Sequence, residues 1–249
     1  MPQGPRRRRN ALHYRWQSVA RWTAIERNLR TEHGPLLAGV DEVGRGPLAG
    51  PVVACAIVMP PEMRAIAGVN DSKQLDRATR DRLAFRIREV ALAIGVGAAS
   101  AREVDRINIY HATVLAMRRA LARVHRTLGI APDHVVVDGL QLRTLGIHHT
   151  AVVKGDAKCY GIACASIIAK VTRDRLMHSL HTRYDGYGWL TNSGYGTLEH
   201  RAGIVARGLT PHHRMSFCLR QQLDLALDAE EAARDAELNA FVDAASQAP

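Results

Sequence analysis

Two adjacent carboxylates, Asp41 and Glu42, follow a short apolar run and precede a turn with three glycines. Charge at the end of a strand, beside backbone that a ligand can approach closely, is typical of a site for phosphate or a metal ion. The glycine spacing, Gly44-x-Gly46-x-x-x-Gly50, has one residue too many for a dinucleotide-binding turn, and the two prolines do not suit a helix start that carries a pyrophosphate. Asp-Glu before glycine can also simply begin a turn.

Two further acids, Asp138 and Asp156, follow later apolar runs of the chain. Asp138 ends the β-branched run 134–138, and Asp156 lies just after residues 150–154. Acids that several strand ends deliver to one sheet edge supply the oxygen ligands that Mg²⁺ or Mn²⁺ requires, with positions left for phosphate and water. A single acid of this kind is more often a cap. Three such sites in one basic protein favour a divalent-cation site, because the carboxylates would otherwise repel one another.

The net charge of +10 is unevenly distributed along the 249 residues. Residues 1–30 hold eight Arg and one Glu, and residues 221–249 hold seven acids and one Arg, so residues 31–220 keep a net charge of +9. A basic central region favours a polyanionic partner, because Lys and Arg release counterions when they neutralise phosphates. Charge alone does not separate this interpretation from one in which the Arg side chains are simply solvated.

Several classes of protein are excluded by composition. The longest apolar runs, such as 51–60, are far shorter than the roughly 20 residues that span a bilayer, and no signal-peptide pattern follows the N-terminal Arg run. The four cysteines form no C-x-x-C pair, which argues against a zinc ribbon and favours reduced, mostly buried thiols. The pairs His148-His149 and His212-His213 are interpreted as surface or phosphate-contacting residues, because adjacent histidines rarely converge on one metal ion. We therefore expect a cytoplasmic protein without a membrane anchor.

The elements that must position these residues follow from hydrophobic periodicity. Strands are predicted at 36–40, 51–59, 93–99, 134–138 and 150–154, and helices at 77–92, 110–128 and 159–184, with one amphipathic helix before Gly34. A loop is expected at 185–200, short helices from about 199 and a fraying acidic helix from 223. The first two strands are linked too tightly for a parallel crossover, so the pattern predicts an α/β fold with a mixed sheet.

The order and spacing of seven motifs resemble those of bacterial ribonuclease HII. The resemblance covers about residues 36–220. Its motifs are Asp41-Glu42-Val43-Gly44-Arg45-Gly46, Asn70-Asp71-Ser72-Lys73, Val136-Val137-Asp138-Gly139, Val153-Lys154-Gly155-Asp156, residues 165–174, Gly194-Tyr195-Gly196-Thr197 and residues 212–217.

The resemblance implies an RNase H-like, mixed five-stranded sheet flanked by helices, with a small C-terminal helical extension. It implies a metal-dependent endonuclease that cuts RNA in RNA–DNA hybrids and at single ribonucleotides embedded in duplex DNA, leaving 3′-hydroxyl and 5′-phosphate ends. Asp41, Glu42, Asp138 and Asp156 would be the catalytic acids and would bind Mn²⁺ or Mg²⁺. Asp174 competes with Asp156 for the fourth place; Asp156 is preferred because it lies in a loop after a strand.

Substrate contacts are carried over position by position. Tyr195 would pack against the sugar after the ribonucleotide, and Gly196, where relatives commonly have Pro, predicts a looser loop. Arg173 could also hold a phosphate, whereas Lys170 is equally well explained as a solvated residue. The residues expected to bind substrate are Gly44, Arg45, Gly46, Ser72, Lys73, Lys154, Ser166, Lys170 and Tyr195.

The expected organisation is a basic extension (1–34), a catalytic domain (35–185), a substrate-binding loop with C-terminal helices (186–222) and an acidic tail (223–249), in a chain that acts as a monomer. Two other functions compete with the nuclease. A non-catalytic nucleic-acid binding module would be expected to lack one of the four acids, and none is missing. A sugar or acetate kinase would need a duplicated lobe, and the chain shows no internal repeat.

Overall fold

Five strands form one mixed sheet, as the sequence predicts. The computed structural model describes residues 23–219. The strands are β1 (Leu37–Val43), β2 (Val52–Val58), β3 (Ala93–Ala99), β4 (His134–Asp138) and β5 (His149–Val152), in the spatial order β3-β2-β1-β4-β5. β2 runs antiparallel to both β1 and β3, whereas β4 is parallel to both β1 and β5. The carboxyl ends of β1, β4 and β5 therefore lie at one edge of the sheet.

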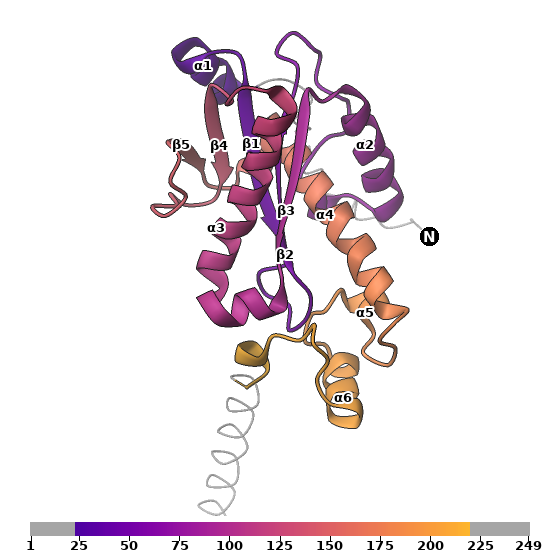
Figure 1. Cartoon of the computed structure of the whole chain (residues 1–249). Coiled ribbons are helices and arrows are strands. Elements are labelled where there is room, and N and C mark those ends of the chain that lie inside the picture. Colours follow the sequence, from indigo (N-terminus) through magenta and orange to yellow (C-terminus); the bar gives the residue numbers. More distant parts are fainter. Residues whose placement is uncertain (1–22, 220–249) are drawn as a thin grey trace, which may run out of the picture.

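Helices cover both faces of this sheet (Figure 1). The helices are α1 (Ala24–His33), α2 (Arg77–Val90), α3 (Ala101–Leu128), α4 (Tyr160–His181), α5 (Trp189–Asn192) and α6 (Leu198–Arg207), with short 3₁₀ turns η1 (Ser72–Gln74) and η2 (Gly155–Ala157). The central strand β2 is buried along its whole length, and its side chains alternate between the core under α3 and the core under α2 and α4. Full burial of a side chain such as Ile57 contributes about 1.5–3 kcal/mol.

Glycines set how closely the helices approach the sheet. A Cβ at Gly39 in β1 would overlap the backbone of Gly161 in the first turn of α4. Likewise, a Cβ at Gly95 or Gly97 in β3 would overlap carbonyl oxygens of α3. The start of α4 is consequently pressed against β1, two residues before the first carboxylate of the site.

Several predicted boundaries are wrong. The first strand does not end before Asp41 but continues to Val43, because Asp41, Glu42 and Val43 pair with β2. The helix predicted at 110–128 is α3, which begins at Ala101, nine residues earlier than predicted. It has a Ser100 capping box and a kink at Asn108, where φ is 64°. The last strand ends at Val152, and the predicted loop 185–200 contains α5 and the start of α6.

Other expectations are confirmed or lie outside the described residues. The helix before Gly34 is α1, and all four cysteines are free and buried. Within residues 23–219, no helix is long and apolar enough to cross a membrane. The division into domains stays a prediction, and the Arg run and the acidic tail lie outside the described part of the chain.

Candidate active site

Parallel pairing places three of the predicted acids at the same sheet edge. Val40 of β1 is level with Val137 of β4, so the next residues, Asp41 and Asp138, are also level, with Glu42 one position further. Asp138 in turn pairs with Val152, the last residue of β5. The chain then needs only a short turn to bring Asp156 to the same edge.

Asp156 is held in this place by the backbone around it. Lys154 adopts a left-handed conformation (φ 57°) that starts η2, and the N–H of Gly155 donates to Asp138 Oδ1 at 2.6 Å. A Cβ at Gly155 would lie 2.6 Å from Ile162 Cδ1 and 3.2 Å from Asp138 Oδ1, so a larger residue would have to displace the end of the Ile162 side chain and would crowd Asp138. Glycine at this position thus lets the turn close onto Asp138.

Burial and mutual repulsion perturb the carboxylates of this cluster. Burial, followed by the charge of Glu42, raises the pKa of Asp41 well above its usual value, while Ser166 and the N–H of Glu42 act in the opposite direction. Burial also raises the pKa of Glu42, with Asp138 adding to the shift against the charge of Arg45. For Asp156, burial, then Asp71 and Asp138, raises the pKa. These groups are short of positive charge, which a cation would supply.

The donor set suits a hard divalent cation, since it consists of carboxylate oxygens. Each of these groups is at present oriented by a local donor. The N–H of Glu42 donates to Asp41 Oδ1 at 2.7 Å, and Arg45 donates to Glu42 Oε1 at 3.4 Å. Within residues 23–219, no three His, Cys, Asp or Glu side chains already surround a point where a metal ion would fit. Cation binding would therefore require these carboxylates to give up some of their local hydrogen bonds and to coordinate the metal ion instead.

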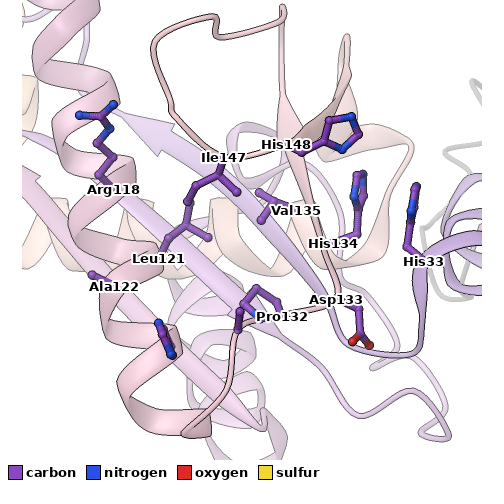
Figure 2. A pocket seen from close by; sticks show the side chains of 12 residues that line it. His33, Arg118, Leu121, Ala122, Pro132, Asp133, His134, Val135, Ile147 and His148 are labelled. Carbon is purple, nitrogen blue, oxygen red and sulfur yellow. The ribbon is translucent and has the colours of Figure 1, made fainter.

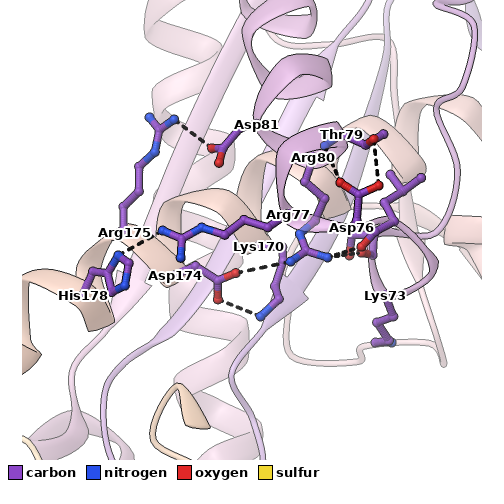
Figure 3. A network of polar contacts seen from close by, with 12 residues as sticks. Lys73, Asp76, Arg77, Thr79, Arg80, Asp81, Lys170, Asp174, Arg175 and His178 are labelled. Atoms are coloured by element: carbon purple, nitrogen blue, oxygen red, sulfur yellow. Dashed lines mark hydrogen bonds and ion pairs between the residues drawn. The ribbon is translucent and has the colours of Figure 1, made fainter. Parts of the chain in front are cut away.

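Asp174, the competitor for the fourth place, has a different set of partners. On α4 it accepts from Lys170 Nζ at 2.7 Å and forms an ion pair with Arg80 at 3.9 Å (Figure 3). Arg80 also donates to the carbonyl oxygens of Ser72, at 3.1 Å, and of Leu75. The main charges that shift the pKa of Asp41, Glu42 and Asp156 come from residues other than Asp174. Asp156 therefore lies with the other acids. Asp174 instead binds Arg80, which holds η1 through the carbonyl oxygens of Ser72 and Leu75; these contacts are called the η1 brace.

The η1 brace holds Ser72 and Lys73 over the carboxylates. Ser72 Oγ lies 2.9 Å from Ser166 Oγ, and Ser166 in turn bonds to Asp41. Burial alone would lower the pKa of Lys73, but the surrounding carboxylates, with Asp71 first, raise it. Lys73 is therefore a firmly protonated cation at the edge of the acid cluster. Arg80 and Asp71 were missed by the sequence analysis, because a charge on a helix or turn gives no signal of the backbone it faces.

Two buried arginines fix the segment 44–51, which begins with the turn Gly44-Arg45-Gly46, called here the Gly-Arg-Gly turn. Arg173, which is 1% exposed, donates to the carbonyls of Ala49, Pro51 and Ser193, so its predicted role as a phosphate contact is wrong. Arg214, fully buried, donates to the carbonyls of Gly44, Arg45 and Gly50, and burial, with Arg173 second, lowers its pKa to about 10.

This arrangement commits the carbonyl oxygens of the turn and leaves its amides available. Within residues 23–219, the N–H groups of Arg45 and Gly46 donate no hydrogen bond to the protein. Gly44 has a φ of 87°, and a side chain there would clash with Arg173. Arg214 was also missed by the sequence analysis, because an arginine in a basic protein does not by itself indicate burial.

Tyr195 stands beside this turn with its ring half exposed (48%). A Cβ at Gly46 would lie 3.6 Å from its Cε1 atom. Its backbone is anchored, because its N–H donates to Asn192 and its carbonyl accepts from His200 Nδ1 at 2.8 Å. Arg201 donates to the carbonyl of Gly196 at 3.0 Å, so backbone contacts restrain the loop in which Gly196 predicted greater freedom.

The histidine pairs only partly fulfil expectation. His148 is exposed, but His149 and His213 are buried, so a surface role for these two is wrong. His213 bonds to His200 Nε2 at 3.1 Å and accepts from the N–H of Thr210, and burial, with His200 second, lowers its pKa to about 4. The sequence could not indicate this, since a histidine pair gives no local signal of the buried histidine and backbone N–H that it faces.

A cavity of about 550 Å³ lies at the opposite end of β4 from Asp138 (Figure 2). His33, His134 and His148 line one side of it, with apolar residues such as Leu121 and Ile147 on the other. None of the four predicted acids lines this cavity. The carboxylate cluster and this cavity are therefore separate features of the molecule.

Comparisons with known proteins agree with this geometry. The family model described as Ribonuclease HII matches residues 38–220. A ribonuclease HII of Synechococcus sp. (strain JA-3-3Ab) is 54% identical over 183 residues, covering 73% of this chain and 80% of that protein. The ribonuclease H2 structure from Pyrococcus horikoshii is 27% identical, with a TM-score of 0.60, over 72% of this chain and 92% of that one.

A second solved structure, Bst-RNase HIII in complex with Mn²⁺, shares the fold. It is 23% identical with a TM-score of 0.59, over 75% of this chain and 68% of that one. The family match covers most of the described residues, and the relative exceeds half identity over nearly three quarters of the chain. The chain therefore belongs to the ribonuclease HII family of metal-dependent endoribonucleases, which act on RNA–DNA hybrids and on ribonucleotides embedded in DNA.

Proposed function

We propose that Asp41, Glu42, Asp138 and Asp156 hold two divalent cations, Mn²⁺ or Mg²⁺, against the phosphate to be cut. The observation that carries this proposal is the parallel pairing of β1, β4 and β5, which with the Gly155–Asp138 hydrogen bond brings these carboxylates to one sheet edge. Burial, with neighbouring carboxylates adding to it, raises the pKa of Asp41, Glu42 and Asp156 there, as expected for a site that lacks positive charge. When bound, such ions acidify the attacking water and neutralise charge on the phosphate and the leaving oxygen in an in-line displacement. No side-chain nucleophile is required.

The Gly-Arg-Gly turn is the proposed reader of the ribose. Arg214 holds the carbonyls of Gly44 and Arg45, Arg173 holds that of Ala49 further along, and the N–H groups of Arg45 and Gly46 remain able to donate to a 2′-hydroxyl. The 2′-hydroxyl is the group that distinguishes a ribonucleotide within a DNA backbone. Tyr195, beside Gly46 and half exposed, would pack against the next sugar.

The basic residues around the acids have unequal roles in this proposal. Lys73 stays protonated among carboxylates and can bind a phosphate oxygen, and exposed Lys154 stands at the start of η2. Lys170 reaches a phosphate only by exchanging its contact with Asp174. Ser72 and Ser166 bond to each other and Ser166 bonds to Asp41, so their part in substrate binding is to orient this carboxylate.

One chain supplies all of these groups, and we propose that it acts as a monomer on hybrids and on duplex DNA with embedded ribonucleotides. The cytoplasm is the proposed location, because relatives such as that of Synechococcus sp. are bacterial ribonuclease HII proteins. Sedimentation of the free protein and of its complex with one duplex checks the stoichiometry.

The test is cleavage of a duplex that contains one ribonucleotide, with Mn²⁺, Mg²⁺ or a chelator, alongside a continuous hybrid and an all-DNA duplex. We expect metal-dependent cuts in the first two only, with 3′-hydroxyl and 5′-phosphate ends. Cleavage in chelator at an unchanged rate would contradict the proposal. So would 2′,3′-cyclic phosphate ends, because they would show that the 2′-hydroxyl is the nucleophile.

A further inference from the structure

Helix α4 begins with a cap that comes from another part of the chain. Its N-cap residue, Cys159, makes no side-chain capping bond. Instead, Glu26 of α1 accepts from the N–H of Tyr160 at 3.0 Å and from the N–H of Gly161 at 2.8 Å. Glu26 is only 2% exposed, so its carboxylate is built into the first turn of α4 across more than 130 residues of sequence.

The same turn of α4 is bonded to the segment that carries Asp156. The N–H of Cys159 donates to the carbonyl of Gly155 at 2.7 Å, and Ile162 packs against Gly155. Gly155 in turn donates to Asp138 Oδ1. A short series of contacts therefore runs from Glu26 through the first turn of α4 to both Asp156 and Asp138.

We propose that Glu26 is a positioning residue for the metal-binding acids: by fixing the first turn of α4 it sets the place of Asp156 relative to Asp138. The inference rests on the proposed function of these two acids. Glu26 lies outside residues 38–220, the part that the family model matches, and it does not touch the carboxylates themselves. Loss of its contacts should loosen η2 and weaken cation binding before it affects the binding of nucleic acid.

Shape and charge can be separated by two substitutions. Glu26→Ala removes both acceptors, whereas Glu26→Gln keeps one carbonyl oxygen and loses the charge that favours a helix N-terminus. Glu32→Gln is the matched control, because Glu32 is an exposed glutamate on the same helix that forms an ion pair with the neighbouring His33. Asp156→Asn serves as the reference for loss of a proposed ligand.

Three measurements test the inference on the full chain. Free Mn²⁺ is quantified by electron paramagnetic resonance during titration of the protein without substrate, cleavage is followed against Mn²⁺ concentration, and hydrogen exchange is followed in residues 153–161. For Glu26→Ala we expect the Mn²⁺ concentration at half-saturation to rise about fivefold or more, by analogy with residues that orient metal ligands. Glu26→Gln should give a smaller rise. Exchange in 153–161 should accelerate, while KM for the duplex at saturating Mn²⁺ and all properties of Glu32→Gln stay unchanged.

The outcomes distinguish the inference from the function on which it rests. Glu26 variants with a lower Tm but unchanged Mn²⁺ binding would show a purely structural role and overturn the inference, provided Asp156→Asn has lost binding. If Asp156→Asn binds Mn²⁺ as the wild type does, the assignment of Asp156 is wrong and the inference falls with it. Should Glu26→Ala fail to fold, Glu26→Gln decides by the same measurements.

Discussion

The two ends of β4 present opposite kinds of polar cluster. At the carboxyl end, Asp138 lies with Asp41 and Asp156, whose pKa values are raised by burial and then by neighbouring carboxylates. At the amino end, burial and then His33 lower the pKa of His134, which bonds to Thr150 Oγ1 at 2.8 Å and stacks on His33 at 4.0 Å.

The difference shows which features indicate chemistry. Burial favours the neutral form of the His134 ring, which keeps its hydrogen bond to Thr150 and its stacking on His33, so this end of β4 needs no ligand although it borders a cavity. The carboxylates do not reach such an arrangement with the donors around them, since burial and neighbouring carboxylates still raise the pKa of Asp41, Glu42 and Asp156. An unmet electrostatic requirement is thus a better guide to the site than a hollow in the surface.

Matched substitutions at the two ends give the largest expected contrast. Asp138→Asn should abolish cleavage, because it removes a ligand charge while keeping the shape, and in chelator it should raise Tm by relieving repulsion. His134→Asn should leave kcat/KM within about twofold and cost about 1 kcal/mol of stability through its lost hydrogen bond. Initial rates and thermal unfolding in chelator measure both. An Asp138→Asn protein with more than about a tenth of the wild-type rate would show that Asp138 is not a ligand.

A second pair of substitutions separates the two candidates for the fourth acid. Asp156→Asn should lose cleavage almost as fully as Asp138→Asn does. Asp174→Asn should retain metal-dependent cleavage with a several-fold loss, because it loosens the η1 brace through Arg80 on Ser72 and Lys73. Rates across a Mn²⁺ titration provide the measurement. Equal and complete losses in both variants would reverse the assignment.

Much of this site could be predicted from local sequence, and the reasons are specific. The acids at the ends of β1 and β4 are visible because a strand that ends in a carboxylate is a local pattern, and parallel pairing then brings them together. The supporting contacts are not local: Arg214 reaches the turn at Gly44 across 170 residues, and Glu26 reaches Tyr160 across 134. Arg173 was misjudged for the same reason, since its burial depends on the carbonyls of a distant turn.

Tyr195→Ala should have a smaller, substrate-dependent effect. The ring beside Gly46 would contact the sugar after the ribonucleotide, a contact of about 1–3 kcal/mol by analogy with aromatic stacking on bases. We expect kcat/KM to fall more for a duplex with one embedded ribonucleotide than for a continuous hybrid. Tyr195→Phe is the control, because it keeps the ring. Equal losses on both substrates would indicate that Tyr195 positions the duplex in general and does not sense the junction.

The smallest expected effect is on the pH dependence of stability, where the two ends of β4 should act in opposite directions. Folding raises the pKa of Asp41, so protonation of Asp41 stabilises the native state. This contribution is lost as the pH rises from the pKa of Asp41 in the unfolded chain through its higher pKa in the folded protein. Folding lowers the pKa of His134, so its contribution is lost as pH falls below about 6.5. In thermal unfolding in chelator between about pH 4 and 8, the Tm of Asp41→Asn relative to that of the wild type should therefore increase as the pH rises.

For His134→Asn, the loss of stability relative to the wild type should instead be smallest at the low-pH end of the profile. There, protonation of the buried His134 already destabilises the native state of the wild type. Differences between each variant and the wild type are needed, because His200 and His213 also have lowered pKa values and contribute to the acidic limb. Saturating Mg²⁺ should remove the advantage of Asp41→Asn at neutral pH, since the cation then stabilises only the protein with intact ligands. A pH profile of Asp41→Asn parallel to that of the wild type would show that repulsion at this end of β4 is already relieved within the protein.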